Sequence, residues 1–174
     1  MKKVAVIVAN GTEELEALTP VDVLRRANAV CDIVSIYGKT VNGSHGILIT
    51  ADKTLSEVDF NDYDGIVIPG GMPGATNISA CEKVVSATKT MLEEGKLVAS
   101  ICASPAVVLA SNGVIKGKKV TCYPAQDFIK MLSENTYTGS DVEISENLIT
   151  ANGPKSAMKF SNEICAFLSL TPKF

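Results

Sequence analysis

Cys102 combines a nucleophilic side chain with a position typical of catalytic residues. It follows the apolar run Leu97–Ile101, which predicts a buried strand, and it precedes Pro105, which suits the first turn of a helix. A thiol at the amino end of a helix lies near unpaired amides and the positive end of the helix dipole, which favour the thiolate. The alternative is a small buried core residue, as free cysteines often are.

Glu16 is the candidate proton carrier for that nucleophile. Glu13 and Glu14 also follow the first predicted strand, but a favourable interaction with the helix dipole explains both. Glu16 falls later in the helical period, so we expect its side chain to point toward the carboxyl ends of the strands. A carboxyl group enclosed there would have a raised pKa and could act as acid or base near neutral pH.

The turn Pro69–Gly74 contains three glycines but lacks the spacing of a dinucleotide-binding or phosphate-binding motif. A tight turn between a strand and a helix is its simplest interpretation. Adjacent glycines also let backbone amides approach a ligand closely. The amides of Gly71 and Ala103 could therefore bind an oxyanion formed when Cys102 attacks a carbonyl group.

The chain has a single histidine, His45, which excludes a multi-histidine zinc site and restricts any Cys–His or Ser–His dyad. His45 lies in the polar turn Asn42–Gly46, where we expect a solvated loop residue rather than a base. Tyr123, at the end of a predicted strand, could reach the rim of the same site. Half-buried core packing is the alternative role for Tyr123, and the one we favour from the sequence.

Length and composition predict one compact domain over residues 1–174. The chain is 46% apolar and 20% charged, so a single core can hold the fold without disulfides or metal ions. The net charge of −3 provides no basic field for nucleic acid or anionic lipid, and we expect neither as a partner.

The cysteines and the amino terminus indicate a cytoplasmic protein. There are five cysteines, an odd number, and they are widely spaced, which predicts free thiols in a reducing compartment. The apolar run Val4–Ala9 is too short for a secretory leader or a membrane span, so we expect a buried first strand there.

Short apolar runs alternate with segments of helical period, which is typical of a doubly wound α/β domain with a mostly parallel sheet. The predicted strands are Val4–Ala9, Asp32–Ile36, Gly46–Ala51, Gly65–Pro69, Leu97–Ile101 and Lys119–Cys122. The predicted helices are Glu13–Arg26, Glu82–Glu94, Pro105–Ser111, Ala125–Ser133 and Pro154–Leu168. We expect Val142–Ala151 to form a hairpin that supplies the last strand. In such sheets ligands bind outside the carboxyl ends of the strands.

Four segments at those ends resemble the ThiJ/PfpI superfamily, in the branch of the parkinsonism-linked protein deglycase. They are Asn10–Glu16, Val67–Gly71, Ala99–Pro105 and Asn152–Pro154, within a match that runs in order from Lys3 to about Leu168. The resemblance implies a three-layer, flavodoxin-like homodimer that needs no cofactor and no metal.

The resemblance also implies roles for individual residues. Cys102 matches the family's nucleophile, and Glu16 matches a protonated glutamate that is hydrogen-bonded to it. Gly71 and Ala103 match the amides that bind the oxyanion. The implied substrate pocket comprises Gly70, Tyr123, His45, Arg26, Asn152 and Pro154.

Two of these positions depart from the branch's best-known member. That protein has a histidine where this chain has Tyr123, and an arginine near the position of His45. Arg26 matches an arginine that the family contributes across the dimer interface. The family's protease-like members carry a histidine directly after the cysteine, and here that residue is Ala103, so we do not expect a protease.

Two functions follow from the resemblance. The first is glutathione-independent conversion of a small dicarbonyl, methylglyoxal, or removal of its early glycation adducts, with Cys102 as nucleophile. The second is a redox-sensing stress protein or holdase chaperone that uses oxidation of Cys102. The same thiol serves both functions, so the sequence leaves them open.

Overall fold

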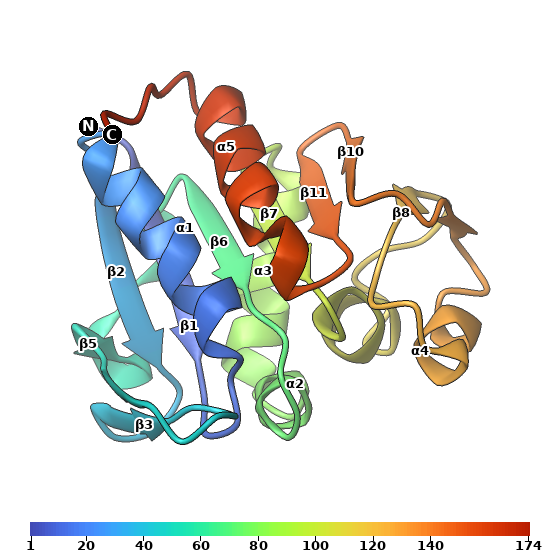
Figure 1. Cartoon of the computed structure of the whole chain (residues 1–174), viewed down its shortest axis with the longest axis horizontal. Coiled ribbons are helices and arrows are strands. Elements are labelled where there is room, and N and C mark those ends of the chain that lie inside the picture. Colours follow the sequence, from blue (N-terminus) through green and yellow to red (C-terminus); the bar gives the residue numbers. More distant parts are fainter.

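The computed structural model describes residues 1–174 and has three layers, with a central sheet between two layers of helices (Figure 1). The sheet has seven strands in the order β10-β11-β7-β6-β1-β2-β5, and only the pair β10 and β11 is antiparallel. The strands are β1 (Lys3–Val8), β2 (Val30–Ser35), β5 (Lys53–Thr54), β6 (Gly65–Ile68), β7 (Leu97–Ile101), β10 (Val142–Ser145) and β11 (Leu148–Ala151). This confirms the predicted α/β, mostly parallel architecture.

The helices cover both faces of the sheet. Helices α1 (Glu14–Arg26) and α5 (Ala157–Phe167) pack side by side on one face (Figure 1). The other face is covered by α2 (Gly74–Ser79), α3 (Glu82–Glu93) and a π-helix at Pro105–Ala110, with α4 (Gln126–Met131) packed against the π-helix. Short 3-10 turns occur at Leu55–Glu57, Phe60–Asp62 and Pro154–Ser156.

Strand β1 shows why the strands are continuously apolar. Val4, Val6 and Val8 belong to the core that contains α1 and α5, whereas Ala5 and Ile7 belong to the core on the opposite face. Successive side chains of a strand point to opposite faces, so a strand covered on both sides must be apolar at every position. The hydrophobic effect on two faces therefore favours an interior position for β1, between β6 and β2.

Two predicted strands lie outside the central sheet. In place of Gly46–Ala51, strand β4 (Leu48–Thr50) pairs antiparallel with β3 (Thr40–Asn42), and only the middle residue of each is buried. Within Lys119–Cys122, strand β8 (Lys119–Val120) pairs with β9 (Thr136–Tyr137). A strand that buries one face has no place inside a sheet covered on both sides, so β3 and β4 form a separate hairpin.

The carboxyl-terminal part follows the prediction more closely. The expected hairpin is present, with β10 paired antiparallel to β11 and β11 paired parallel to β7. Helix α2 was not predicted, because its sequence of small and polar residues has no apolar period. No helix combines the length and the apolar character that crossing a membrane requires.

Candidate active site

Cys102 lies on a sharp elbow between β7 and the π-helix, as its position in the sequence predicts. Its φ is +65°, a left-handed conformation that costs a non-glycine residue about 1–2 kcal/mol. Two backbone hydrogen bonds hold it there: its N–H donates to the Ala151 carbonyl at 2.9 Å, and its own carbonyl accepts from the N–H of Tyr123 at 2.8 Å. Strain that is held in this way is common where a side chain must be presented for function.

Glu16 reaches this elbow from the first turns of α1 and is completely buried. Its Oε2 accepts a hydrogen bond from the Gly70 amide at 2.8 Å, while Oε1 has no conventional hydrogen-bond partner. A side chain at position 70 would place its Cβ 2.6 Å from the Cβ of Cys102 and 2.7 Å from Glu16 Oε2. Gly70 therefore allows the carboxyl group and the cysteine to lie together.

The pKa values of the two groups are coupled. Burial raises the pKa of Glu16 to about 7, although the interactions with Cys102 and the Gly70 amide act in the opposite direction. Burial also raises the pKa of Cys102, and the negative charge of Glu16 raises it further. The amides of Ala103 and Gly71 lower it. The two groups cannot both ionise near neutral pH, so the pair holds at most one negative charge and a thiolate requires a protonated Glu16.

This coupling corrects the expectation from the sequence that the helix end alone favours the thiolate. The positive end of the helix is present, but the thiol is enclosed, and burial disfavours its charged form. The thiolate of Cys102 therefore depends on local donors. Those identified by the structure are the two backbone amides and, when protonated, Glu16.

Gly71 supplies one of those amides from a conformation that suits only glycine. Its φ is +87°, and a Cβ there would collide with the backbone nitrogen of Glu13 and the carbonyl oxygen of Gly11. The Ser104 hydroxyl donates to the Pro69 carbonyl at 2.5 Å and ties the elbow to the same turn. The structure thus brings Cys102, Glu16 and the predicted oxyanion amides together.

Glu13 connects helix α1 to this turn, a role that the sequence analysis missed. Its Oε2 accepts from the Glu16 amide at 2.8 Å and caps the helix, while its own N–H donates to the Gly70 carbonyl at 3.0 Å. The three-residue spacing between Glu13 and Glu16 is usual for a capping residue and its partner, so this role could have been predicted from the sequence.

A pocket of about 430 Å³ adjoins the elbow. It is lined by Tyr123, Pro124, Asp141, Asn152, Gly153, Pro154, Lys155 and Ser156. Tyr123 is 46% exposed, so it is half-buried as predicted, but it belongs to neither hydrophobic core, and the prediction of core packing is wrong. Gly153 lies beside the Tyr123 ring, and a Cβ at this position would be in ordinary contact with it, at 3.4 Å. The hydrogen bond from the Tyr123 amide to the Cys102 carbonyl links one wall of this pocket to the elbow, although Cys102 itself does not line the pocket.

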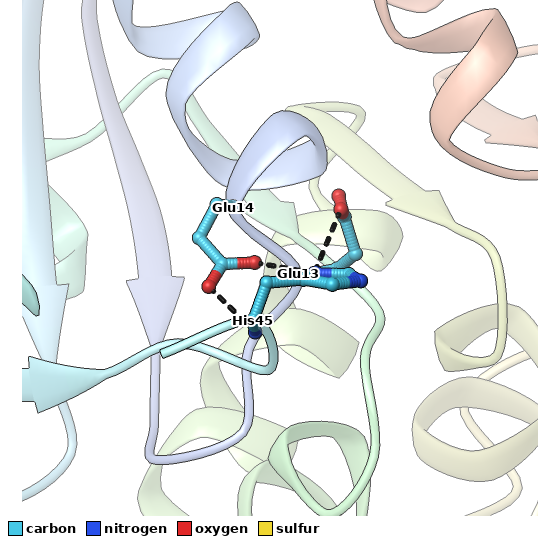
Figure 2. Close-up of side chains that lie close together, drawn as sticks. All are labelled: Glu13, Glu14 and His45. Atoms are coloured by element: carbon cyan, nitrogen blue, oxygen red, sulfur yellow. Dashed lines mark hydrogen bonds and ion pairs between the residues drawn. The ribbon is translucent and has the colours of Figure 1, made fainter. Parts of the chain in front are cut away.

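His45 and Arg26 lie apart from this centre within the chain. The His45 side chain is 70% exposed, as predicted, but its Nδ1 lies 2.9 Å from Glu14 Oε2 (Figure 2). Arg26 is the last residue of α1, at the opposite end of the helix from Glu16, where it pairs with Asp22 at 2.8 Å. Neither makes a hydrogen bond or an ion pair with Cys102 or Glu16.

One cluster combines side chains that can ligate a metal ion: Glu13, Glu14 and His45, whose ligand atoms lie within 4.8 Å of one another. Both oxygens of Glu14 already accept hydrogen bonds from the loop that carries His45 (Figure 2). These bonds lower the pKa of Glu14 to about 2, although burial acts in the opposite direction. Helix-dipole complementation, the explanation offered from the sequence, is therefore incomplete: Glu14 is a buried anchor for this loop.

The chain is similar to several known proteins. It is 38% identical to Protein DJ-1 homolog B of Arabidopsis thaliana over 92% of this chain, and spans 36% of that longer relative. It is 35% identical to the Parkinson disease protein 7 homolog of Danio rerio, over 92% of this chain and 86% of the relative. It is also 32% identical to the putative cysteine protease YraA of Bacillus subtilis, over 93% of this chain and 95% of the relative.

Solved structures give the same result for the fold. The structure titled Toxoplasma gondii DJ-1, oxidized, has a TM-score of 0.89 and 38% identity, and the match covers 97% of this chain and 91% of that one. The model of the DJ-1/PfpI family matches residues 2–166, which include every residue of the site described above. With the Cys102 elbow, the three-layer fold and this match in agreement, the chain belongs to the DJ-1/PfpI family.

Proposed function

We propose that this protein is a cysteine-dependent glyoxalase that needs neither glutathione nor a cofactor, and that it also acts on early adducts of methylglyoxal. One observation carries the proposal. The Cys102 thiol lies against a carboxyl group whose pKa is about 7 and against the amides of Gly71 and Ala103. Together these supply a nucleophile, a proton carrier and oxyanion donors, which are the parts that carbonyl chemistry requires.

In the first step the Cys102 thiolate forms a bond to the aldehyde carbon of methylglyoxal. The carbonyl electron pair moves onto oxygen, where the amides of Gly71 and Ala103 stabilise the developing charge. Protonated Glu16 then gives its proton to this oxygen, and the product is a hemithioacetal. A carboxyl group with a pKa near 7 suits this step because it holds its proton at neutral pH yet releases it readily.

In the second step the carboxylate of Glu16 removes the hydrogen on the former aldehyde carbon as a proton. The electron pair moves onto the oxygen of the neighbouring ketone, which takes up the proton of the hemithioacetal hydroxyl. Glu16 then returns its proton to the neighbouring carbon, which gives a lactoyl thioester on Cys102. Water cleaves the thioester and restores the thiol, so that the overall reaction is methylglyoxal plus water to lactate and a proton.

The surroundings of the elbow support a small carbonyl substrate and a two-chain assembly. Tyr123, Asn152 and Pro154 line the adjoining pocket and would contact the part of an adduct that does not react. We propose a homodimer in which Arg26 of one chain faces the site of the other. Exposed apolar side chains at Leu15, 59% exposed, and Leu48, 69% exposed, support burial of this region against a second chain.

Lactate production from methylglyoxal without glutathione tests the proposal. The native protein should form lactate, and Cys102→Ala should form none. Cys81→Ala is the matched control, because Cys81 is a partly exposed free cysteine at the start of α3, outside the site, and this variant should keep full turnover. Absence of turnover in the native protein, with Cys102 shown by mass spectrometry to be reduced, would refute the glyoxalase.

Redox sensing is the second candidate, and the free oxygen of Glu16 favours it. Oε1 is buried without a hydrogen-bond partner, so a protonated Glu16 has a donor position available for an oxygen added to Cys102. The related Toxoplasma gondii structure is described as oxidized. Intact-mass measurements after peroxide treatment should show oxygen on Cys102 well before the other four cysteines. Equal oxidation of all five would contradict this role.

A cysteine protease has less support, although one relative carries that name. The only imidazole of the chain, that of His45, is bound to Glu14. The residue after Cys102 is Ala103, so no histidine stands beside the nucleophile to act as its base.

A further inference from the structure

We propose that His45 is a positioning residue for the Cys102–Glu16 pair, acting through Glu14 and the β3–β4 loop. Part of the pH dependence of Cys102 reactivity then belongs to an imidazole that makes no direct contact with the pair. The inference rests on the Cys102–Glu16 site of the proposed function, but it does not depend on methylglyoxal as the substrate.

Glu14 fastens the loop between β3 and β4 to the start of α1. Its Oε1 accepts from the His45 amide at 2.8 Å and more weakly from the Ile47 amide at 3.4 Å. Its Oε2 accepts from the Ser44 hydroxyl at 3.2 Å and lies 2.9 Å from His45 Nδ1 (Figure 2). One buried carboxylate thus takes up four donors of a single loop, and we call this set of contacts the Glu14 anchor.

The same loop is bonded to the segment that precedes α1. The Gly11 amide donates to the Asn42 carbonyl at 2.8 Å, and the Ser44 amide donates to the Thr12 carbonyl at 2.9 Å. Gly11 in turn packs so closely against Gly71 that a Cβ at position 71 would collide with it. The loop therefore supports the turn that supplies the Gly71 amide.

A second set of contacts leads from the anchor to Glu16. Glu13, the neighbour of Glu14, accepts a hydrogen bond from the amide of Glu16 and donates one to the carbonyl of Gly70. The amide of Gly70 in turn donates to the carboxyl group of Glu16. Movement of the first turn of α1 would shift all three. The anchor is thus separated from the reactive pair by one residue of chain and two hydrogen bonds, which is a short path for mechanical coupling.

His45 is the component of the anchor whose ordinary pKa is closest to neutral pH. The charged groups that face it are Glu14 and, at 3.7 Å, Glu13, both from the start of α1. The hydrogen bond to Glu14 and its negative charge raise the pKa of His45. The imidazolium is therefore present at and below the ordinary histidine pKa, and the ion pair is lost as the pH rises through the raised value. A neutral imidazole can still donate from Nδ1, so the change is partial.

The test compares three proteins by the rate at which iodoacetamide alkylates Cys102 between pH 5.5 and 9. His45→Arg keeps a positive charge throughout this range, and His45→Gln carries none but retains a donor. If the proposal is correct, the ratio of native to His45→Gln rates exceeds one at low pH and approaches one at high pH. The expected range is at most about fivefold, because a neutral imidazole keeps part of the contact and only the charge of the pair is lost. The ratio of His45→Arg to His45→Gln rates should change much less with pH.

Hydrogen exchange supplies a readout of position rather than charge. The amides of His45 and Ile47 both donate to Glu14, so their protection should decrease with rising pH in the native protein, after correction for intrinsic exchange, but not in His45→Arg. Ratios of alkylation rates that do not vary with pH, or unchanged protection, would overturn the proposal. Alkylation needs no turnover, so a protein without glyoxalase activity still gives a decisive result.

Discussion

Two glutamates in the first turn of α1 are both buried, yet their pKa values move in opposite directions. Glu14 has a pKa of about 2 and Glu16 a pKa of about 7. Both side chains are almost inaccessible to solvent, but Glu14 lies just beneath an exposed loop whereas Glu16 lies deep in the fold, so burial is the main cause of the raised pKa of Glu16. The number of donors acts in the same direction: four from the loop face Glu14, whereas one backbone amide binds Glu16.

The first turn of α1 thus provides both an anchor, Glu14, and a proton carrier, Glu16. A carboxylate that is fully supplied with donors stays ionised and holds structure together. A carboxyl group supplied with one amide and a neighbouring thiol keeps its proton near neutral pH, where it is available for chemistry.

Glu16→Gln should have the largest effect on activity. The amide cannot carry a proton to and from the substrate, so we expect lactate formation from methylglyoxal to decrease by about 100-fold or more. Glu14→Gln is the matched control, and its turnover should stay within about tenfold of the native value. Full activity in Glu16→Gln would contradict the proton-carrier role of Glu16. It would mean that Cys102 and the backbone amides are sufficient for turnover.

Gly71→Ala should have the next largest effect, because a Cβ there meets backbone on two sides. We expect substantial destabilisation and a large loss of turnover. Gly95→Ala is the control, since Gly95 has a φ of +74° but no atom within 4 Å of the added Cβ. That variant should lose only about 1 kcal/mol from its left-handed conformation. Urea denaturation measures both, and equal losses would contradict the crowding at Gly71.

The sequence predicts the parallel sheet and the Cys102 elbow well because both depend on local patterns. Apolar runs covered on two sides, such as Leu97–Ile101, are distinctive, and a nucleophile before Pro105 follows a known turn geometry. Helix α2 escaped prediction because it is short and is stabilised by burial of Ala75 and Ile78 rather than by an apolar period.

The electrostatics of the site could not be predicted in the same way. The sequence shows that Glu14 and His45 are 31 residues apart, but not that a loop brings them into contact. It shows the helix that begins after Cys102, but not how deeply the thiol is enclosed. A pKa shift depends on burial and on every nearby donor, and those are properties of the assembled chain.

The stability of the two glutamate variants should depend on pH with opposite signs. Glu14 has a lowered pKa in the folded state, so its stabilising effect is present above the ordinary value of 4.5 and is lost as the pH falls toward 2. Glu16 has a raised pKa, so its effect is present below 4.5 and is lost as the pH rises through about 7. Each shift corresponds to at most about 3.5 kcal/mol.

Thermal unfolding of Glu14→Gln, Glu16→Gln and the native protein from pH 2.5 to 8.5 measures these effects. Glu14→Gln should be less stable than the native protein at neutral pH, and this difference in stability should decrease below pH 4.5. The stability of Glu16→Gln should increase relative to that of the native protein as the pH rises above 4.5. Only the native protein must ionise a buried carboxyl group in this range. Parallel pH profiles for the two variants would contradict the opposite pKa shifts.

Asp22→Asn should have the smallest effect, and it completes the comparison with an exposed carboxylate on the same helix. Asp22 pairs with Arg26 at 2.8 Å, one helical turn away, and its side chain is 63% exposed. Water and salt screen such a pair, so urea denaturation should show a loss of at most about 0.5 kcal/mol. Arg26 also lies over the Phe174 ring at 5.7 Å, a contact that the substitution leaves in place. If Asp22→Asn lost as much unfolding free energy at neutral pH as Glu14→Gln, the Glu14 anchor would be no stronger than an ordinary exposed ion pair. Burial and multiple donors would then not explain the difference between them.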